Sequence, residues 1–198
     1  LASFGHASPE PRDIRFLFIG TLTPRKRLLE LVNAFSRVSN SDASLHLVGD
    51  SSRDTEYAAR VHSLCARDSR VVVRGVLNDR DLAQALSEAS ALVLPSSFEG
   101  YGMVITEAIH HGVPIVATAV GAIPEATGEG EHALLVNVED LHVTLQRLAS
   151  DESLRTRMRH AATEKARMLP TWREATTAFE SVLDELHQAA ATQHGPTP

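Results

Sequence analysis

Short apolar runs alternate with amphipathic segments along most of this chain of 198 residues. Between the runs, apolar residues recur at helical spacing, as they do from Leu28 to Phe35. Six runs have the length and composition of buried strands, and they cover residues 14–19, 45–48, 71–73, 91–94, 114–117 and 132–136. Strands separated by helices form a parallel sheet that is covered on both faces. The pattern therefore predicts an α/β domain: a Rossmann-like, doubly wound parallel sheet of about six strands with C-terminal helices.

The intervening segments set the expected helices and the limits of the domain. Asn78 is placed to cap a helix, and another helix is expected to start near Met103. The remaining helices are predicted at 26–38, 54–67, 79–87, 139–149, 152–168 and 173–187. Residues 1–13 contain two prolines and no periodicity, so we expect an interdomain linker remnant there. The domain is then 14–187, and 188–198 is expected to be a disordered tail.

Composition narrows the classes of partner and cofactor. The net charge is −6 and no long basic run occurs, which argues against a nucleic-acid partner and against attraction to anionic membranes. Cys65 is the single cysteine, so no disulfide framework or thiolate metal cluster is expected, and its helical spacing predicts a buried thiol. The 10 histidines lack metal-ligand spacing, and the adjacent His110 and His111 are interpreted as structural. No apolar run approaches the roughly 18 residues needed to cross a membrane.

Several candidate binding residues directly follow strands. The loop from Gly20 to Lys26 follows the first strand, Gly49 follows the second, the loop from Glu99 to Val104 follows the fourth and Gly121 follows the fifth. Ligands of doubly wound sheets bind outside the carboxyl ends of the strands, where the strand order reverses. These residues are therefore expected to converge on one edge of the sheet.

Two charged groups in these loops have alternative interpretations. Arg25, Lys26 and Arg27 would place three cations at a helix entrance, against the macrodipole, and a bound diphosphate would resolve that conflict. A solvated surface cluster explains the cations about as well. Glu99 and Glu107 lie across a loop-to-helix junction with glycines between them, which suits a ligand bearing hydroxyls and a phosphate. Ordinary helix-entry acids are the alternative.

The segment around these acids closely resembles the donor-binding segment of the group 1 retaining glycosyltransferases, which have the two-domain GT-B architecture. The family's pattern is Pro-Ser-x-x-Glu-Gly-Phe-Gly, a second Glu eight positions after the first, and Gly-x-Pro-Val-Val-Ala. This chain has Glu107 as the second acid, flanked by Pro95-Ser96-Ser97-Phe98-Glu99-Gly100-Tyr101-Gly102 and Gly112-Val113-Pro114-Ile115-Val116-Ala117. The resemblance covers about 14–187, which in the family is the C-terminal, donor-binding half of the enzyme.

The resemblance implies a role for each candidate residue. Lys26 matches the lysine that contacts the donor's diphosphate, Glu99 the carboxylate that meets the donor sugar, and Glu107 the one that holds the ribose hydroxyls. Thr21 stands where many members carry a second arginine, so Arg25 is expected to substitute in part. The implied catalytic residues are Lys26, Glu99 and Arg25. The implied donor-binding residues are Gly20, Thr21, Gly75, Val76, Gly102, Met103, Val104 and Glu107.

The resemblance also implies a reaction. The intact enzyme would transfer a sugar from a nucleoside diphosphate sugar to an acceptor hydroxyl with retention, without a metal or other cofactor. The isolated chain would be inactive because the N-terminal acceptor-binding domain is missing. A cytoplasmic protein is expected, with membrane contact only through that absent domain. A dinucleotide-dependent oxidoreductase is disfavoured because Gly-x-Gly-x-x-Gly is absent after the first strand. A non-catalytic nucleotide-sugar-binding module, which Thr21 favours, and a sugar-nucleotide epimerase stay open.

Overall fold

The computed structural model of the chain describes residues 14–128, 130–170 and 172–193. It divides into two compact units, with the boundary between Arg167 and Met168. The predicted linker, 1–13, lies outside the described residues. The first unit holds the sheet and its covering helices, and the second consists essentially of the last helix.

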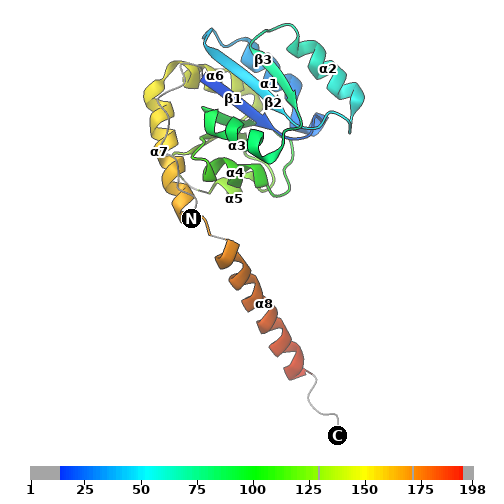
Figure 1. Cartoon of the computed structure of the whole chain (residues 1–198), viewed down its shortest axis with the longest axis vertical. Helices are drawn as coiled ribbons and strands as arrows, with labels where there is room; N and C mark the ends of the chain where they lie inside the picture. The colour runs from blue at the N-terminus through cyan, green and yellow to red at the C-terminus, as the bar shows by residue number, and fades with distance from the viewer. Residues whose placement is uncertain (1–13, 129, 171, 194–198) are drawn as a thin grey trace. The chain divides into compact units, whose positions relative to one another are not determined.

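The first unit is built on one six-stranded, fully parallel sheet with strand order β3-β2-β1-β4-β5-β6 (Figure 1). The strands are β1 Ile14–Ile19, β2 Ala43–Val48, β3 Val71–Gly75, β4 Ala91–Leu94, β5 Ile115–Thr118 and β6 Ala133–Val136. This confirms the predicted Rossmann-like, doubly wound sheet. The central strand β1 pairs with both β2 and β4, so the order of winding reverses between β1 and β4. Ligand sites of open α/β sheets lie at such a switch point.

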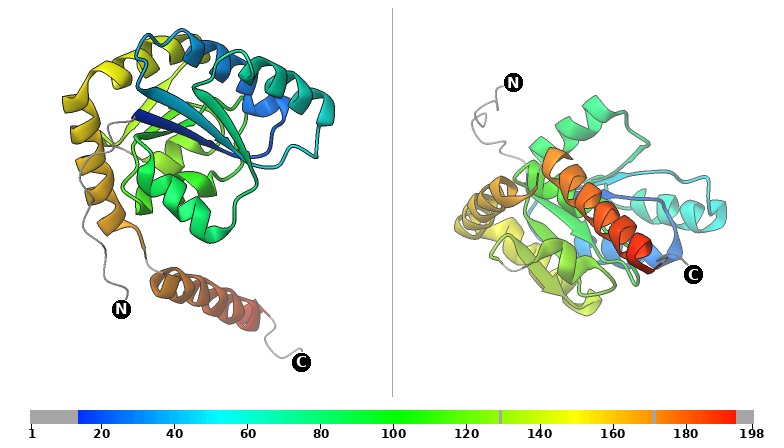
Figure 2. Two further views of the ribbon diagram at one scale, coloured as in Figure 1. Left: turned by 45° about the horizontal axis from the view of Figure 1, so that its top comes forward. Right: turned by 90° about the horizontal axis from the view of Figure 1, so that it is seen from below.

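Helices cover both faces of the sheet (Figures 1 and 2). Helices α1, α2 and α6 lie together on one face, and α3, α4 and α5 lie on the other. Their bounds are α1 Leu28–Ser36, α2 Thr55–Cys65, α3 Asp79–Glu88, α4 Met103–His110, α5 Ile123–Thr127, α6 Leu141–Ser150 and α7 Glu152–Met168, with 3-10 turns η1 Pro24–Lys26 and η2 Val138–Asp140. Asn78 caps α3 as predicted, since its side chain accepts a hydrogen bond from the Asp81 N–H at 3.0 Å.

Two local predictions were wrong. The helix expected from Lys26 begins only at Leu28, because Arg27 adopts a left-handed conformation (φ 51°) that separates the 3-10 turn from α1. The short helix α5, with Pro124 in its first turn, lies where the sequence analysis predicted no helix. Proline is tolerated in the first turn because the N–H that it lacks has no intrahelical partner there.

The core is mainly aliphatic, in keeping with an aromatic content of only 5%. Strands β4 and β5 are buried along their whole length, and Leu17, Leu92 and Val116 are completely inaccessible. Strands covered on both faces lose their alternation of apolar and polar residues, which explains the continuous apolar runs in the sequence. Cys65 is buried within α2, in agreement with its predicted role as a core thiol.

The second unit is described by itself. Helix α8 runs from Trp172 to Gln193, beyond its predicted end at His187, and the rest of the predicted tail, 194–198, lies outside the described residues. Phe179, Val182, Leu183 and Leu186 of this helix are exposed. Within the described parts of the chain, no helix combines the length and apolarity that a membrane span requires.

Candidate functional site

The loop after β1 is held against the loop after β2 by two glycines. The Gly20 N–H donates to the Val48 carbonyl at 2.9 Å, and the Leu22 N–H donates to the Asp50 carbonyl at 2.8 Å. A Cβ at Gly49 would lie 2.0 Å from the Gly20 oxygen, so only glycine allows this approach. Gly20 in turn leaves room for Lys26, whose Cε would lie 3.4 Å from a Cβ at Gly20. The glycines thus fix the path that brings Lys26 to the carboxyl edge of the sheet.

Lys26 is buried, with 5% of its surface exposed, and its Nζ forms an ion pair with Glu99 Oε2. The solvated surface cluster considered from the sequence is therefore wrong for Lys26. The expected conflict with a helix dipole is also absent, since Lys26 lies in η1 and not at the start of α1. Instead, the Tyr57 hydroxyl accepts hydrogen bonds from the Leu28 and Leu29 N–H groups at 2.8 and 3.3 Å. The entrance of α1 therefore has a partner within the protein.

Three further hydrogen bonds join the loop after β1 to the loop after β4. The Arg25 carbonyl accepts from the Ser97 N–H at 2.7 Å and from the Ser97 hydroxyl at 3.1 Å. The Arg25 guanidinium donates to the Phe98 carbonyl at 3.1 Å. Arg25 is exposed, but these hydrogen bonds connect it to the neighbouring loop. In this structure Arg25 joins the two loops that carry Lys26 and Glu99, and its catalytic role stays a prediction.

The entrance of α4 provides a second candidate group at the same edge. Gly102 is buried, adopts φ 78° and precedes α4 without a capping side chain. The first N–H groups of a helix have no intrahelical acceptor. Those at the start of α4, beginning with Met103 and Val104, therefore offer donors and the positive end of the helix dipole to an anion.

The two predicted acids differ in environment. Glu99 lies on the loop before α4 with 13% of its side chain exposed, whereas Glu107 is an exposed residue in the second turn of α4. Only Glu99 contacts Lys26 among the described ion pairs. The buried acid is thus held beside a cation, and the exposed one is free to accept hydrogen bonds from hydroxyl groups.

The end of β3 contributes to the same edge. Gly75 is its last residue, with φ 67°, and its carbonyl accepts from the Gly49 N–H at 2.8 Å. Val76 follows with 73% of its surface exposed. The carboxyl ends of β1, β2 and β3 are therefore joined through main-chain contacts, and Gly75 and Val76, two of the implied donor-binding residues, lie at this edge.

Three residues around Glu99 make contacts that the sequence analysis did not predict. The buried Ser96 has its hydroxyl 3.4 Å from Glu99 Oε2, and the buried Thr118 donates its hydroxyl to the Ser96 carbonyl at 2.5 Å. A Cβ at Gly121 would lie 2.0 Å from the Glu99 carbonyl oxygen. The sequence indicated only that Gly121 follows a strand and that Ser96 belongs to a motif. Thr118 had no signal because its contact joins two different strands.

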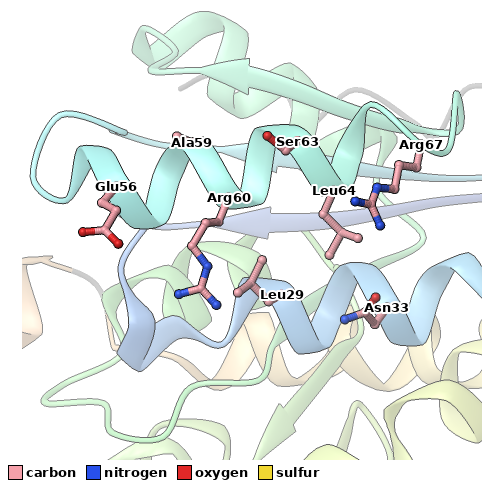
Figure 3. Close-up of a pocket in the computed structure, with 8 residues that line it drawn as sticks. All are labelled: Leu29, Asn33, Glu56, Ala59, Arg60, Ser63, Leu64 and Arg67. Atoms are coloured by element: carbon pink, nitrogen blue, oxygen red, sulfur yellow. The ribbon is translucent and has the colours of Figure 1, made fainter.

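One groove on the surface lies away from these residues. It has a volume of about 490 Å³ and runs between α1 and α2, lined by Leu29, Asn33, Glu56, Ala59, Arg60, Ser63, Leu64 and Arg67 (Figure 3). None of the predicted site residues lines it. In the described residues, no group of three or more histidine, cysteine, aspartate or glutamate side chains is placed to hold a metal ion.

Comparisons with known proteins bear on the family and the fold of this chain. The family model described as "Glycosyl transferases group 1" matches residues 13–151. Mannosylfructose-phosphate synthase from Agrobacterium fabrum is 32% identical over 168 residues, which are 79% of this chain and 37% of that protein. D-inositol 3-phosphate glycosyltransferase from Corynebacterium efficiens is 30% identical over 178 residues, with 85% and 42% coverage. The chain thus spans less than half the length of these relatives.

Solved structures of similar proteins show the same fold. Sucrose-phosphate synthase from Thermosynechococcus elongatus superposes with a TM-score of 0.80 at 25% identity, over 91% of this chain and 47% of that one. Anabaena HepE in complex with UDP and glucose superposes with a TM-score of 0.75 at 20% identity, over 89% and 49%. The family match covers most of the chain, and the fold is that of one Rossmann-like half of a GT-B enzyme. This chain therefore belongs to the group 1 glycosyl transferases.

Proposed function

We propose that this chain is the nucleotide-sugar donor domain of a retaining glycosyltransferase. The observation that carries the proposal is the buried Lys26–Glu99 pair at the switch point of the sheet. A buried charge is costly unless it is paired, and Glu99 is the partner of Lys26 in the ligand-free protein. In the complex, the diphosphate of the donor is the candidate partner. HepE, which has the same fold, has been crystallised with UDP and with UDP-glucose, which supports a nucleotide sugar as the ligand.

The chemistry assigned to these residues is stabilisation of a leaving group. The departing diphosphate gains negative charge as the glycosidic bond breaks, and a preorganised cation with N–H donors stabilises that charge. Lys26 would supply the cation, and the N–H groups at the start of α4 would supply the donors. These groups can do so without a divalent ion, so no metal is expected.

The two acids are assigned to different parts of the donor. Glu107 is exposed and is assigned to the ribose hydroxyls, whereas Glu99, beside Lys26, is assigned to the sugar. Because Glu99 carries a negative charge next to the predicted phosphate position, it should oppose binding of a nucleoside diphosphate that lacks a sugar. Glu99 should therefore increase the affinity only for a nucleoside diphosphate that carries a sugar.

Calorimetry on the 198-residue chain tests this assignment. UDP, GDP and ADP would be compared with UDP-glucose, GDP-mannose and ADP-glucose. Glu107→Ala should weaken binding of diphosphate and nucleotide sugar equally, because both contain ribose. Glu99→Gln should leave diphosphate binding unchanged or strengthen it, and should abolish the additional affinity due to the sugar. Glu56→Ala, an exposed acid in the groove of Figure 3, is the matched control and should change neither affinity. The reverse ranking of the two acids would contradict the assignment.

A non-catalytic nucleotide-sugar-binding module is the second candidate. It is favoured by Thr21, which replaces an expected arginine, and by Arg25, whose guanidinium donates to the Phe98 carbonyl. In the protein joined to its acceptor-binding half, Thr21→Arg should raise turnover if a second cation limits transfer. The isolated chain should transfer no sugar in either case, and turnover by this chain alone would refute that expectation.

A further inference from the structure

We propose that Thr118 is a positioning residue for Glu99, and that the segment from Thr118 to Ala122 holds the Glu99 loop in the geometry that pairs it with Lys26. A catalytic consequence of this positioning depends on the proposed function, because that function assigns Glu99 to the donor sugar. The positioning itself concerns the ligand-free protein and can be tested without any ligand.

The first contact comes from the end of β5. Thr118 is 3% exposed, and its hydroxyl donates to the Ser96 carbonyl, two residues beyond the end of β4. Main-chain pairing between β4 and β5 joins Leu94 to Ala117 but does not continue to Ser96 and Thr118. The threonine hydroxyl therefore extends the connection between the two strands by one step, into the loop that carries Glu99.

The second contact is made by the turn that follows β5. The Ala122 N–H donates to the Glu99 carbonyl at 3.0 Å. Gly121 adopts φ 55°, and a Cβ there would lie 2.0 Å from the same carbonyl oxygen. The loop is thus held at Ser96 by a hydroxyl and at Glu99 by a main-chain N–H, with a glycine required for the close approach.

These contacts act on the carboxylate of Glu99 through Ser96. The Ser96 residue is inaccessible to solvent, and its hydroxyl lies 3.4 Å from Glu99 Oε2, the oxygen that pairs with Lys26. A short chain of contacts therefore leads from Thr118 through Ser96 to Glu99 and Lys26. Loosening the loop at Ser96 should let Glu99 move away from Lys26, although the Thr118 hydroxyl itself contacts the Leu94 and Ser96 carbonyls and not Glu99.

Lysine reactivity offers a direct test because the sequence contains only two lysines, Lys26 and Lys165. Acylation of the ligand-free chain by an N-hydroxysuccinimide ester would be followed at each lysine by mass spectrometry. The buried, paired Lys26 should react slowly, and Lys165 on α7 reports the activity of the reagent. Thr118→Val keeps the shape of the side chain and removes the hydroxyl. One hydrogen bond contributes roughly 0.5–1.5 kcal/mol, so acylation at Lys26 should accelerate about two- to tenfold.

Three variants separate positioning from general loss of packing. Thr118→Ser retains the hydroxyl and should restore protection of Lys26. Thr127→Val is the matched control, since Thr127 is also buried and its hydroxyl donates to the Ile123 carbonyl at 2.9 Å within α5. That change should leave Lys26 protected. In a Glu99→Gln background, Thr118→Val should add nothing further, because residues that act through one another are not additive.

The functional part uses UDP and UDP-glucose as probes. If the wild-type chain binds UDP-glucose more tightly than UDP, Thr118→Val should reduce that difference two- to tenfold, with UDP affinity unchanged. If the wild-type chain binds neither probe nor any other nucleotide, the proposed function fails, and acylation alone decides whether Thr118 positions Glu99. The inference is overturned if Thr118→Val and Thr127→Val give the same rate of acylation at Lys26, or if Thr118→Ser does not restore protection.

Discussion

Removing the charge of either member of the Lys26–Glu99 pair should destabilise the ligand-free protein. The side chains are 7% and 13% exposed, so each charge depends on the other for compensation. Removing one partner of a fully buried pair costs about 3–5 kcal/mol. Glu99 keeps a hydroxyl neighbour in Ser96 and some access to water, so we expect Lys26→Met to cost less, about 2 kcal/mol. For a protein of this size, that loss lowers the melting temperature by roughly 4–8 °C.

A double-mutant cycle isolates the contribution of the pair. Lys26→Met and Glu99→Gln would be made singly and together, and unfolding free energies would be measured with urea. The double variant removes both charges, so it should be more stable than the sum of the single losses implies, with a coupling of about 1 kcal/mol or more. The matched control is the exposed pair of Arg167 and Glu164, with side chains 70% and 42% accessible. Arg167→Met should change stability by less than about 0.5 kcal/mol.

The cycle can also refute the structural reasoning. If Lys26→Met is as stable as the wild type, or if the two single losses simply add, Lys26 is not a buried partner of Glu99 in solution. The solvated surface cluster considered from the sequence would then describe Lys26 better. If the double variant recovers stability but binds no nucleoside diphosphate, the pair contributes to stability and Lys26 is also required for binding, as the proposed function expects.

Three further predictions concern other parts of the first unit. Burial, followed by the charges of Arg15 and Arg74, lowers the pKa of His46 to about 4. Between about pH 6.5 and 4 the unfolded chain therefore binds more protons than the folded one, so the free energy of unfolding should fall as the pH decreases through this range. His46→Gln should flatten this dependence in urea titrations. Burial raises the pKa of Cys65 to about 11, so a disulfide reagent at pH 8 should modify the native thiol roughly a hundredfold more slowly than the denatured one. Gly49→Ala places a Cβ 2.0 Å from the Gly20 oxygen and should cost more than about 2 kcal/mol in thermal unfolding, whereas Gly100→Ala points into open space and should be nearly neutral.

The sequence predicted the centre of the sheet well because β4 and β5 are buried along their whole length and β1 along most of it. The runs at 91–94 and 14–19 coincide with β4 and β1, and Gly20 closes the first strand as expected. Parallel strands end at the same edge, so the convergence of the loops after β1 and β4 also follows from the pattern alone. These predictions depend on the hydrophobicity of consecutive residues, which the local sequence shows directly.

The pairing of Lys26 with Glu99 could not be predicted, because the two residues are 73 positions apart and a charge in a loop is normally solvated. The start of α1 was missed for a different reason. Arginine rarely adopts φ near 51°, so no residue type marked the break at Arg27. The short helix α5 begins after Gly121 and contains Pro124, both of which are typical of loops. Tertiary contacts therefore decided each of these features.

The position of the pair follows from the order of the strands. Strands β1 and β4 are neighbours in the sheet, but the helices that follow them, α1 and α4, lie on opposite faces. The two loops leave the same edge towards different faces, and Lys26 in the first of them is only 5% exposed. Its charge is compensated by Glu99, whose carbonyl accepts a hydrogen bond from the Ala122 N–H after β5, and under the proposed function an anionic ligand would take over that compensation. A ligand that brings both a diphosphate for Lys26 and hydroxyls for Glu99 can satisfy both partners when it separates them, whereas inorganic phosphate can satisfy only the cation and should bind much more weakly.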